Sequence, residues 1–422
     1  MASLDLSPLR ARSFRILLIS QAISVLGDGL TTVAIAFAVL AVTGSISDVG
    51  LVLSVRLLPM IALMLLGGAV ADRQRRERVM ALSQLGSAAC QAVLAGLLIA
   101  GVARLWMMAL LYLGLGCAQA AFRPALSGLV PELVAKRELT AANGLMAIGV
   151  SAGQILGPTA GGVVTAVGSP GLAIGIDAGT FLVSALLLMR LRKSNRSGQG
   201  AWHVKKTSVF ADVLEGWAVV RSRAWLWGMI SYFSVFQFAV FGGLYVLGPA
   251  VARAELGGAS TWGALLAASG AGSLAGGALA LRWRPRLLLV GANLAVLGVV
   301  PAFVFLALAG REAWGVAAMV VYGGSLAYAG ALWESALQAN VRAAELSRVA
   351  SYDWLGSIAL KPAGYALAGP VAVAIGTASE LWVIAAIVVA GSLVLISVPS
   401  VRGIGIPEHA MASGAATVPE PS

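Results

Sequence analysis

Charged side chains interrupt several long apolar stretches of this sequence. Asp28, Arg56, Asp177 and Glu334 each lie within a stretch long enough to cross a bilayer, and so does Lys361. A charge at the centre of a bilayer costs about 2.5–3.5 kcal/mol on insertion scales, so such residues usually face a partner or a wet cavity. A carboxylate in that setting suits proton uptake and release, or the binding of a cation.

Two interpretations compete for these charged residues. Asp28, Arg56, Asp177 and Glu334 are candidates for proton coupling or substrate binding, and Asp28 and Asp177 are the leading carboxylates. Asp28 and Arg56 are expected at similar depths in neighbouring spans, so the alternative for them is a static ion pair. Glu334 is expected close to a cytoplasmic helix end, where the alternative is a simple interfacial position.

Small residues recur at four-residue spacing in one apolar stretch, at Gly153, Gly157 and Gly161, followed by Gly162. Such spacing lets membrane helices approach closely. Pro158 in the same stretch removes a backbone hydrogen bond and can bend the helix. The pattern predicts either a deformable contact between two helix bundles or ordinary tight packing, and the residues by themselves favour ordinary packing.

Aromatic residues are dense between residues 225 and 245, and Tyr232 and Phe236 are candidates to line a cavity for cationic or planar compounds. Packing in the core or against lipid is the more common role of such residues. The sequence therefore offers these two as candidate cavity aromatics, with packing as the alternative.

Catalytic chemistry is not expected. Gly149-x-Ser151-x-Gly153 has the spacing of a hydrolase nucleophile elbow, but it lies inside a membrane-length apolar run. The histidines, His203 and His409, lie far outside that run. No cluster of His, Cys and carboxylate residues has metal-ligand spacing. We expect no enzyme, no catalytic residue, no metal and no cofactor.

The elements that position these residues follow from composition. Of the 422 residues, 59% are hydrophobic and 11% are charged, whereas roughly 25% are charged in an average soluble domain. A span needs roughly 20 mostly apolar residues. The sequence predicts an all-α membrane protein with about twelve transmembrane helices, near 14–42, 47–71, 79–101, 105–131, 139–167, 170–191, 224–250, 260–281, 287–309, 313–339, 351–376 and 379–398.

Two stretches recur about half a chain length apart. The stretch that begins Gly67-Gly68-Ala69 resembles the one that begins Gly276-Gly277-Ala278, and 160–168 resembles 368–376. Both copies run in the same direction, which indicates two parallel halves related by a pseudo-twofold axis along the membrane normal. We divide the chain into a cytoplasmic lead (1–13), an N-terminal six-helix bundle (14–191), a cytoplasmic linker with an amphipathic helix (192–223), a C-terminal six-helix bundle (224–398) and a disordered cytoplasmic tail (399–422).

The net charge of +11 is unevenly distributed. Most of the 29 Lys and Arg residues fall in the lead, the linker and every second loop, whereas the intervening loops hold Arg104, Arg253 and Arg311. This positive-inside pattern predicts that both termini are cytoplasmic. The basic balance therefore reflects membrane topology and not a nucleic-acid partner.

Several motifs in this sequence resemble those of a known family. The basic loop Gly68-x-x-x-Asp72-Arg73-x-x-Arg76 is similar to the signature of the loop between helices 2 and 3 in the major facilitator superfamily. The stretch from Gly153 to Gly162 resembles the helix-5 motif of its antiporter branches. Gly27-Asp28-Gly29 and the stretch after Arg56 are similar to its twelve-span drug and siderophore exporter subgroup, which holds macrolide-efflux and enterobactin-export proteins.

The resemblance implies alternating access by two bundles that rock around a central site. It implies that Gly68, Asp72, Arg73 and Arg76 form a cytoplasmic gate that latches in the outward-open state, and that the glycine-rich motif shapes the interface between the halves. Many drug–proton antiporters have an arginine in helix 4 where this chain has Leu110. That departure moves the expected proton route to Asp28, Arg56 and Asp177.

We therefore expect a secondary active transporter that exports a hydrophobic or amphiphilic small molecule, such as a drug, antibiotic or siderophore-like compound, by proton-coupled antiport. The alternatives are an exporter of a lipid or endogenous metabolite, an importer, or a non-transporting membrane sensor on the same fold. We expect a monomeric, multi-pass protein of the plasma membrane, whose partners are the lipid bilayer, the small-molecule substrate and protons.

Overall fold

Eleven helices in the described part of the chain are long and apolar enough to cross a membrane. The computed structural model describes residues 6–191, 220–310, 312–342, 345–346, 349, 352–353, 356 and 358–404, with the backbone alone at 64–73, 136 and 312. These residues form an all-helical fold, as the composition predicts. The linker with its amphipathic helix is predicted for 192–223 and the disordered tail for 399–422. Of these segments, 192–219 and 405–422 lie outside the described residues.

The first half runs from the short η1 (Ser7–Arg10) to α7, and its spans are α1 (Arg12–Thr43), α2 (Ile46–Arg73), α3 (Arg76–Ile99), α4 (Leu105–Gln119) with α5 (Phe122–Leu133), α6 (Leu139–Val167) and α7 (Pro170–Met189). The short η2 (Lys136–Glu138) joins α5 to α6. These six spans coincide with the first six predicted from the sequence.

The second half begins with a broken span of α9 (Ala224–Phe236), η3 (Gln237–Phe241), η4 (Gly243–Leu247) and α10 (Gly248–Glu255). It continues with α11 (Ala259–Arg282), α12 (Leu288–Val296) with η5 (Leu297–Val299) and α13 (Val300–Leu308), α14 (Glu312–Asn340), α16 (Lys361–Ile375), α17 (Thr377–Ser397) and α18 (Pro399–Arg402). The predicted span at 351–376 contains α16, whose 15 residues are too few for a full span by themselves.

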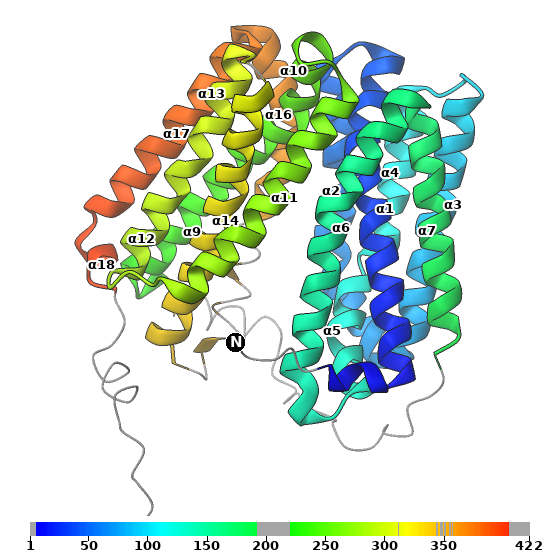
Figure 1. The fold of residues 1–422 in the computed structure, drawn as a ribbon, viewed down its shortest axis with the longest axis horizontal. Helices are drawn as coiled ribbons and strands as arrows, with labels where there is room; N and C mark the ends of the chain where they lie inside the picture. Colours follow the sequence, from blue (N-terminus) through cyan, green and yellow to red (C-terminus); the bar gives the residue numbers. More distant parts are fainter. Residues whose placement is uncertain are drawn as a thin grey trace, which may run out of the picture.

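Figure 1 shows two helix bundles side by side, which meet near α10 and α16 and diverge toward α5 and α18. In the first bundle α1 packs between α6 and α7, and α2 packs on α4. In the second, α11 packs on α14 and α13 on α17. The main contacts between the bundles are α6 with α11 and α2 with α16.

The two contacts between the bundles are related by the internal repeat. The first pair of matching stretches lies in α2 and α11, and the second pair lies in α6 and α16. Each contact between bundles thus joins one helix of each kind, one from each half. A parallel pseudo-twofold axis requires this arrangement, because it carries α2 onto α11 and α6 onto α16.

Glycines set the distance between these helices. A Cβ on Gly162 of α6 would lie 2.5 Å from the carbonyl oxygen of Ala259 on α11, and one on Gly50 of α2 would lie 2.0 Å from that of Tyr365 on α16. The hydroxyl of Ser54 donates to the carbonyl oxygen of Pro362 at 2.8 Å. Backbone therefore meets backbone at both contacts.

The glycine stripe of α6 faces its own bundle, which corrects part of the sequence prediction. A Cβ on Gly153, Gly157 or Gly161 would meet α1 at Val25, at the carbonyl oxygen of Leu26 or at that of Leu30. The stripe thus packs α6 on α1 inside the first half.

The side of α6 that faces the other half is formed by two neighbours of that stripe. The carbonyl oxygen of Pro158 would lie 2.5 Å from a Cβ on Gly263, and the Cα of Gly162 lies against the same glycine. Pro158 and Gly162 therefore lie at the interface between the halves, although the Pro158 ring also lies against Gly29 of α1.

Candidate functional site

A cavity of about 1790 Å³ lies between the two halves. Its lining extends along α5 to Pro131 and the first turns of α6 at one end, and reaches only Ile35, Leu53 and Leu266 at the other. The end where the lining stops is the end where the bundles meet in Figure 1. The cavity therefore extends toward the end where α5 lies and stops below the α2–α16 and α6–α11 contacts.

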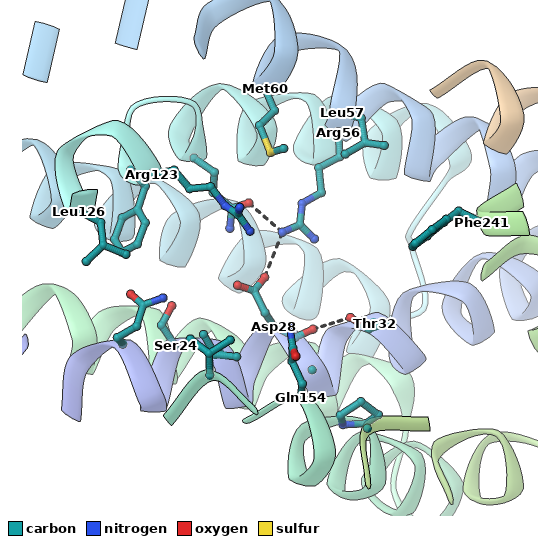
Figure 2. Close-up of a pocket in the computed structure, with 18 of the residues that line it drawn as sticks. Ser24, Asp28, Thr32, Arg56, Leu57, Met60, Arg123, Leu126, Gln154 and Phe241 are labelled. Atoms are coloured by element: carbon teal, nitrogen blue, oxygen red, sulfur yellow. Dashed lines mark hydrogen bonds and ion pairs between the residues drawn. The ribbon is translucent and has the colours of Figure 1, made fainter. Parts of the chain in front are cut away.

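Asp28 and Arg56 form an ion pair on the wall of this cavity (Figure 2), the contact that the sequence offered as the alternative to a functional role. An Arg56 Nη atom lies 3.0 Å from an Asp28 carboxylate oxygen and also donates to the Gln119 side-chain oxygen at 2.7 Å. The Asp28 and Arg56 side chains are 36% and 23% exposed, so water in the cavity reaches both. The pair joins α1 to α2, and Gln119 adds α4.

The two glycines beside Asp28 explain its position. A Cβ on Gly27 would lie 2.3 Å from an Asp177 carboxylate oxygen of α7, and one on Gly29 would lie 2.7 Å from the Cα of Gly157 on α6. The backbone of α1 is therefore wedged closely between α6 and α7. The side chain of Asp28 is left on the free side of α1, toward the cavity.

A glycine of α4 places Arg56 in a similar way. A Cβ on Gly116 would lie 2.1 Å from the Arg56 carbonyl oxygen and 2.8 Å from the Pro59 ring. The absence of a side chain lets α4 pack directly on α2. Gln119, one turn beyond Gly116, is thereby brought within hydrogen-bonding distance of the Arg56 guanidinium.

Asp177 does not line the cavity. Its side chain is fully buried behind α1 and accepts hydrogen bonds from Thr31 at 2.6 Å, Gln91 at 2.8 Å and Thr180 at 3.1 Å. The three donors satisfy the carboxylate within the first bundle. Direct contact of Asp177 with a substrate in this cavity, which the sequence left open, is not compatible with this conformation, because α1 lies between them.

Three other candidates also lie away from the cavity. Glu334 of α14 is exposed and is not among the lining residues. Tyr232 and Phe236 are buried, and the Tyr232 hydroxyl is 2.9 Å from Ser392 of α17 and donates to the carbonyl oxygen of Val388 at 3.1 Å. Of the two roles that the sequence offered for them, these residues have the one that it favoured, which is packing in the core.

The cavity aromatics come instead from the next turns of the same span, where the helix widens into the π-helical segments η3 and η4. Phe241 and Tyr245 stack with their ring centroids 5.8 Å apart, and Tyr245 meets Tyr365 of α16 edge-on at 6.3 Å. Each lines the cavity. Such π-helical turns are rare and frequently mark functional sites.

Two basic side chains that were not among the candidate site residues also line the cavity. Arg123 of α5 points into the cavity beside the Asp28–Arg56 pair (Figure 2). The Lys361 ammonium of α16 lies 4.0 Å from the centre of the Phe241 ring and 5.8 Å from that of Tyr365. The position of Lys361 in an apolar run, one helical turn before Tyr365, was the available signal.

The residues predicted to form a cytoplasmic gate lie partly outside what the structure describes. For Gly68, Asp72 and Arg73 the structure describes the backbone alone. Arg76, at the start of α3, donates to the Gly128 carbonyl oxygen at 2.6 Å and to the Glu132 carboxylate at 2.8 Å, both on α5. These two contacts tie α3 to α5 at the end of the first bundle where the cavity lining extends. No group of three His, Cys, Asp or Glu residues in the described ranges could hold a metal ion.

Two helical bundles with a largely apolar cavity between them, and charged side chains on its wall, are an architecture typical of membrane transporters. The model of the Major Facilitator Superfamily matches residues 17–357. The chain therefore belongs to the major facilitator superfamily, a family of secondary transporters and not of enzymes.

Comparison with individual proteins agrees with this family. The chain is 28% identical over 362 residues, 82% of each chain, to the enterobactin exporter EntS of Citrobacter koseri. It is 31% identical over 201 residues to the uncharacterized MFS-type transporter YfiS of Bacillus subtilis, a match that spans 47% of each chain. The solved structure of the nucleoside transporter NupG has a TM-score of 0.71 at 14% identity and covers 92% of this chain and 98% of its own.

A bacterial homologue of the iron transporter ferroportin, solved in an inward-facing state, has a TM-score of 0.68 at 17% identity and covers 91% of this chain and 98% of its own. At these identities the structural matches establish the fold. They confirm the predicted all-helical major facilitator fold.

Proposed function

We propose that this protein exports a hydrophobic or amphiphilic small molecule in exchange for protons, by alternating access of the central cavity. The cavity between the halves, with an ion pair of Asp28 and Arg56 on its wall, carries this proposal. The similarity to proteins named as enterobactin exporters supports export over import. We place the protein in the plasma membrane as a monomer. The positive-inside pattern supports a cytoplasmic location of both termini.

In this topology the cavity extends toward the cytoplasm in the present conformation. Backbone contacts of α6 with α11 and of α2 with α16 close the outer end. Transport would require these contacts to separate while the cytoplasmic ends of the bundles come together. Asp72, Arg73 and Arg76 would then latch the cytoplasmic end, with charge-assisted hydrogen bonds that form and break in each cycle.

Proton coupling would act through Asp28. A proton on its carboxyl group removes the negative charge that holds the Arg56 guanidinium. Arg56 then keeps its hydrogen bond to Gln119 and no longer binds α1. A substrate group that binds Arg56 breaks the same ion pair without the proton. Protonation of Asp28 and substrate binding are therefore alternative ways to release α1 from α2, and antiport results when each of them drives one half of the transport cycle. Asp177 would add to coupling only through α1, which separates it from the cavity.

A transport assay in inside-out vesicles tests this proposal. With an inside-acid proton gradient, addition of a transported compound from a panel of dyes, macrolides, tetracyclines and siderophores should release lumenal protons in a saturable manner. Asp28→Asn should abolish this release, whereas Glu334→Gln, a matched carboxylate change outside the cavity, should retain it. Unchanged exchange in Asp28→Asn would refute the role of Asp28, and compound movement independent of the gradient would refute antiport.

A further inference from the structure

The cavity wall has an excess of positive charge. Among the described residues that line it, the basic side chains are Arg56, Arg123 and Lys361, and the carboxylate is Asp28. Arg56 is paired with Asp28. Neither Arg123 nor Lys361 makes an ion pair with any described residue. The cavity wall therefore presents two cations that no described carboxylate neutralises.

These cations are near enough to act on one another. Arg123 and Arg56 both repel the Lys361 ammonium electrostatically. Apolar walls around a cavity focus such a field, so like charges that face one space attract an ion of opposite sign into it. An unpaired charge inside a membrane protein is also expensive. A bound anion would relieve both the repulsion and the lack of a counter-charge.

The surroundings of Lys361 add a second requirement. Its ammonium lies over the face of Phe241 and near that of Tyr365, so the rings stabilise the cation. Phe241, Tyr245 and Tyr365 contact one another as a cluster on the cavity wall. A planar ring in the cavity could stack on this cluster with its anionic group at the ammonium.

A cationic substrate fits this wall poorly. Asp28 is the carboxylate available to it among the described lining residues, and that carboxylate already accepts from Arg56. A cation would have to displace Arg56 and leave a third unpaired positive charge on the wall. The cost of such like-charge contacts favours the opposite sign of substrate.

We propose that Lys361 and Arg123 form an anion-binding subsite in the cavity, and that the transported compound is an organic anion with an aromatic ring. The subsite lies beside the Asp28–Arg56 pair, so a bound anion also competes with the Asp28 carboxylate for Arg56. This inference rests on the proposed transport function for its biological meaning, but binding of an anion can be measured without transport.

Two xanthene dyes of opposite charge provide a direct test. Fluorescein is anionic and rhodamine 123 is cationic, and both have the same three-ring core. Fluorescence anisotropy with the purified full-length protein in lipid nanodiscs should show saturable fluorescein binding, at least tenfold tighter than that of rhodamine 123. Equal or tighter binding of rhodamine 123, or the absence of saturable fluorescein binding, would overturn the proposal.

Variants locate the subsite. Lys361→Gln should weaken fluorescein binding roughly tenfold or more, the usual loss for one charge-assisted contact, and should leave rhodamine 123 binding equal or improved. Arg123→Gln should act in the same direction. Lys361→Arg should retain the preference for the anion, which separates loss of charge from a folding defect. Arg104→Gln, the same change in a loop outside the cavity, should leave both affinities unchanged, and a Lys361→Gln protein with intact fluorescein affinity would refute the assignment.

The same panel in vesicles separates this inference from the transport proposal. Proton-coupled movement of a cationic compound that survives Lys361→Gln would support transport and overturn the anion subsite. Lys361-dependent fluorescein binding without any transport would support the subsite and overturn the exporter in favour of a sensor.

Discussion

Gly162 of α6 and Gly263 of α11 pack backbone to backbone at the closed end of the cavity. A Cβ on Gly162 would lie 2.9 Å from the Cα of Gly263 and 2.5 Å from the carbonyl oxygen of Ala259. Both obstacles are backbone atoms, which can move only if α11 moves. The contact therefore closes this end of the cavity and is sensitive to a single methyl group.

Gly162→Ala should open the closed end. The opening can be measured as the accessibility of position 53 to a thiol reagent, because Leu53 lines the cavity just below the closure. The assay uses Leu53→Cys in a protein whose free cysteines are removed by Cys90→Ser and Cys117→Ser. A membrane-impermeant maleimide added from the α10 side should react several-fold faster after Gly162→Ala, since the equilibrium shifts toward opening at that end.

The matched control is Gly144→Ala on the same helix, where a Cβ would meet nothing within 4 Å. It should leave the labelling rate unchanged. Equal rates in the two variants would show that the α6–α11 contact does not hold this end shut.

The glycine-rich motif shows what a sequence pattern can predict. Its four-residue spacing correctly indicated close helix packing, because any residues four apart share one helix face. The spacing could not identify the partner. The stripe of Gly153, Gly157 and Gly161 faces α1, and Gly162, one residue outside the stripe, faces the other bundle. Only the tertiary arrangement of α6 between α1 and α11 decides between them.

The Asp28–Arg56 pair should behave as a coupled unit in a double-mutant cycle. Asp28→Asn and Arg56→Gln each leave one charge unpaired, and the double variant removes both. The loss of unfolding free energy in the double variant should be smaller than the sum of the single losses by about 1 kcal/mol, because cavity water screens a partly exposed pair. Unfolding of the three variants in detergent measures this. Strict additivity would show that the ion pair adds nothing to stability.

Part of the candidate site could be predicted from the depth of its residues in the membrane. Helix length fixes how deep a residue lies, so Asp28 and Arg56 could be paired from their positions in adjacent spans. Depth does not show which way a side chain points. The sequence therefore could not show that Asp177 lies behind α1, away from the cavity. The subsite at Lys361 depends on Phe241, which the π-helical segments bring to the cavity, and regular 3.6-residue periodicity does not anticipate such segments.

Asp177→Asn should destabilise the first bundle more than Asp28→Asn. The buried carboxylate accepts from two hydroxyl groups and the Gln91 amide. An asparagine presents one oxygen acceptor, and its amino group would face these donors. The unsatisfied groups should cost about 1–3 kcal/mol each, measured as a lower unfolding midpoint in detergent. If Asp177→Asn were as stable as the parent but lost proton dependence, Asp177 would have a coupling role instead of a structural one.

Acid should weaken the end of the second bundle through Glu345, which follows α14. Hydrogen bonding from Arg342 holds the pKa of Glu345 below its usual value, burial opposes that shift, and the hydrogen bond from Arg223 at 2.8 Å reinforces it. A lowered folded-state pKa means that the stabilisation is complete above the unfolded-state pKa, near 4.3 for glutamate, and is lost as pH falls through the folded-state value.

The difference in unfolding midpoint between the parent and Glu345→Gln should therefore be constant near neutral pH and shrink below about pH 4. Glu334→Gln, which changes an exposed carboxylate of the same half, should show a small difference at every pH. A difference for Glu345→Gln that persisted at low pH would mean that its effect comes from packing, since a protonated glutamate and a glutamine would then differ in shape alone. Convergence at low pH would assign the effect to the two arginines, because they are the groups that bind the ionised form in preference to the neutral one.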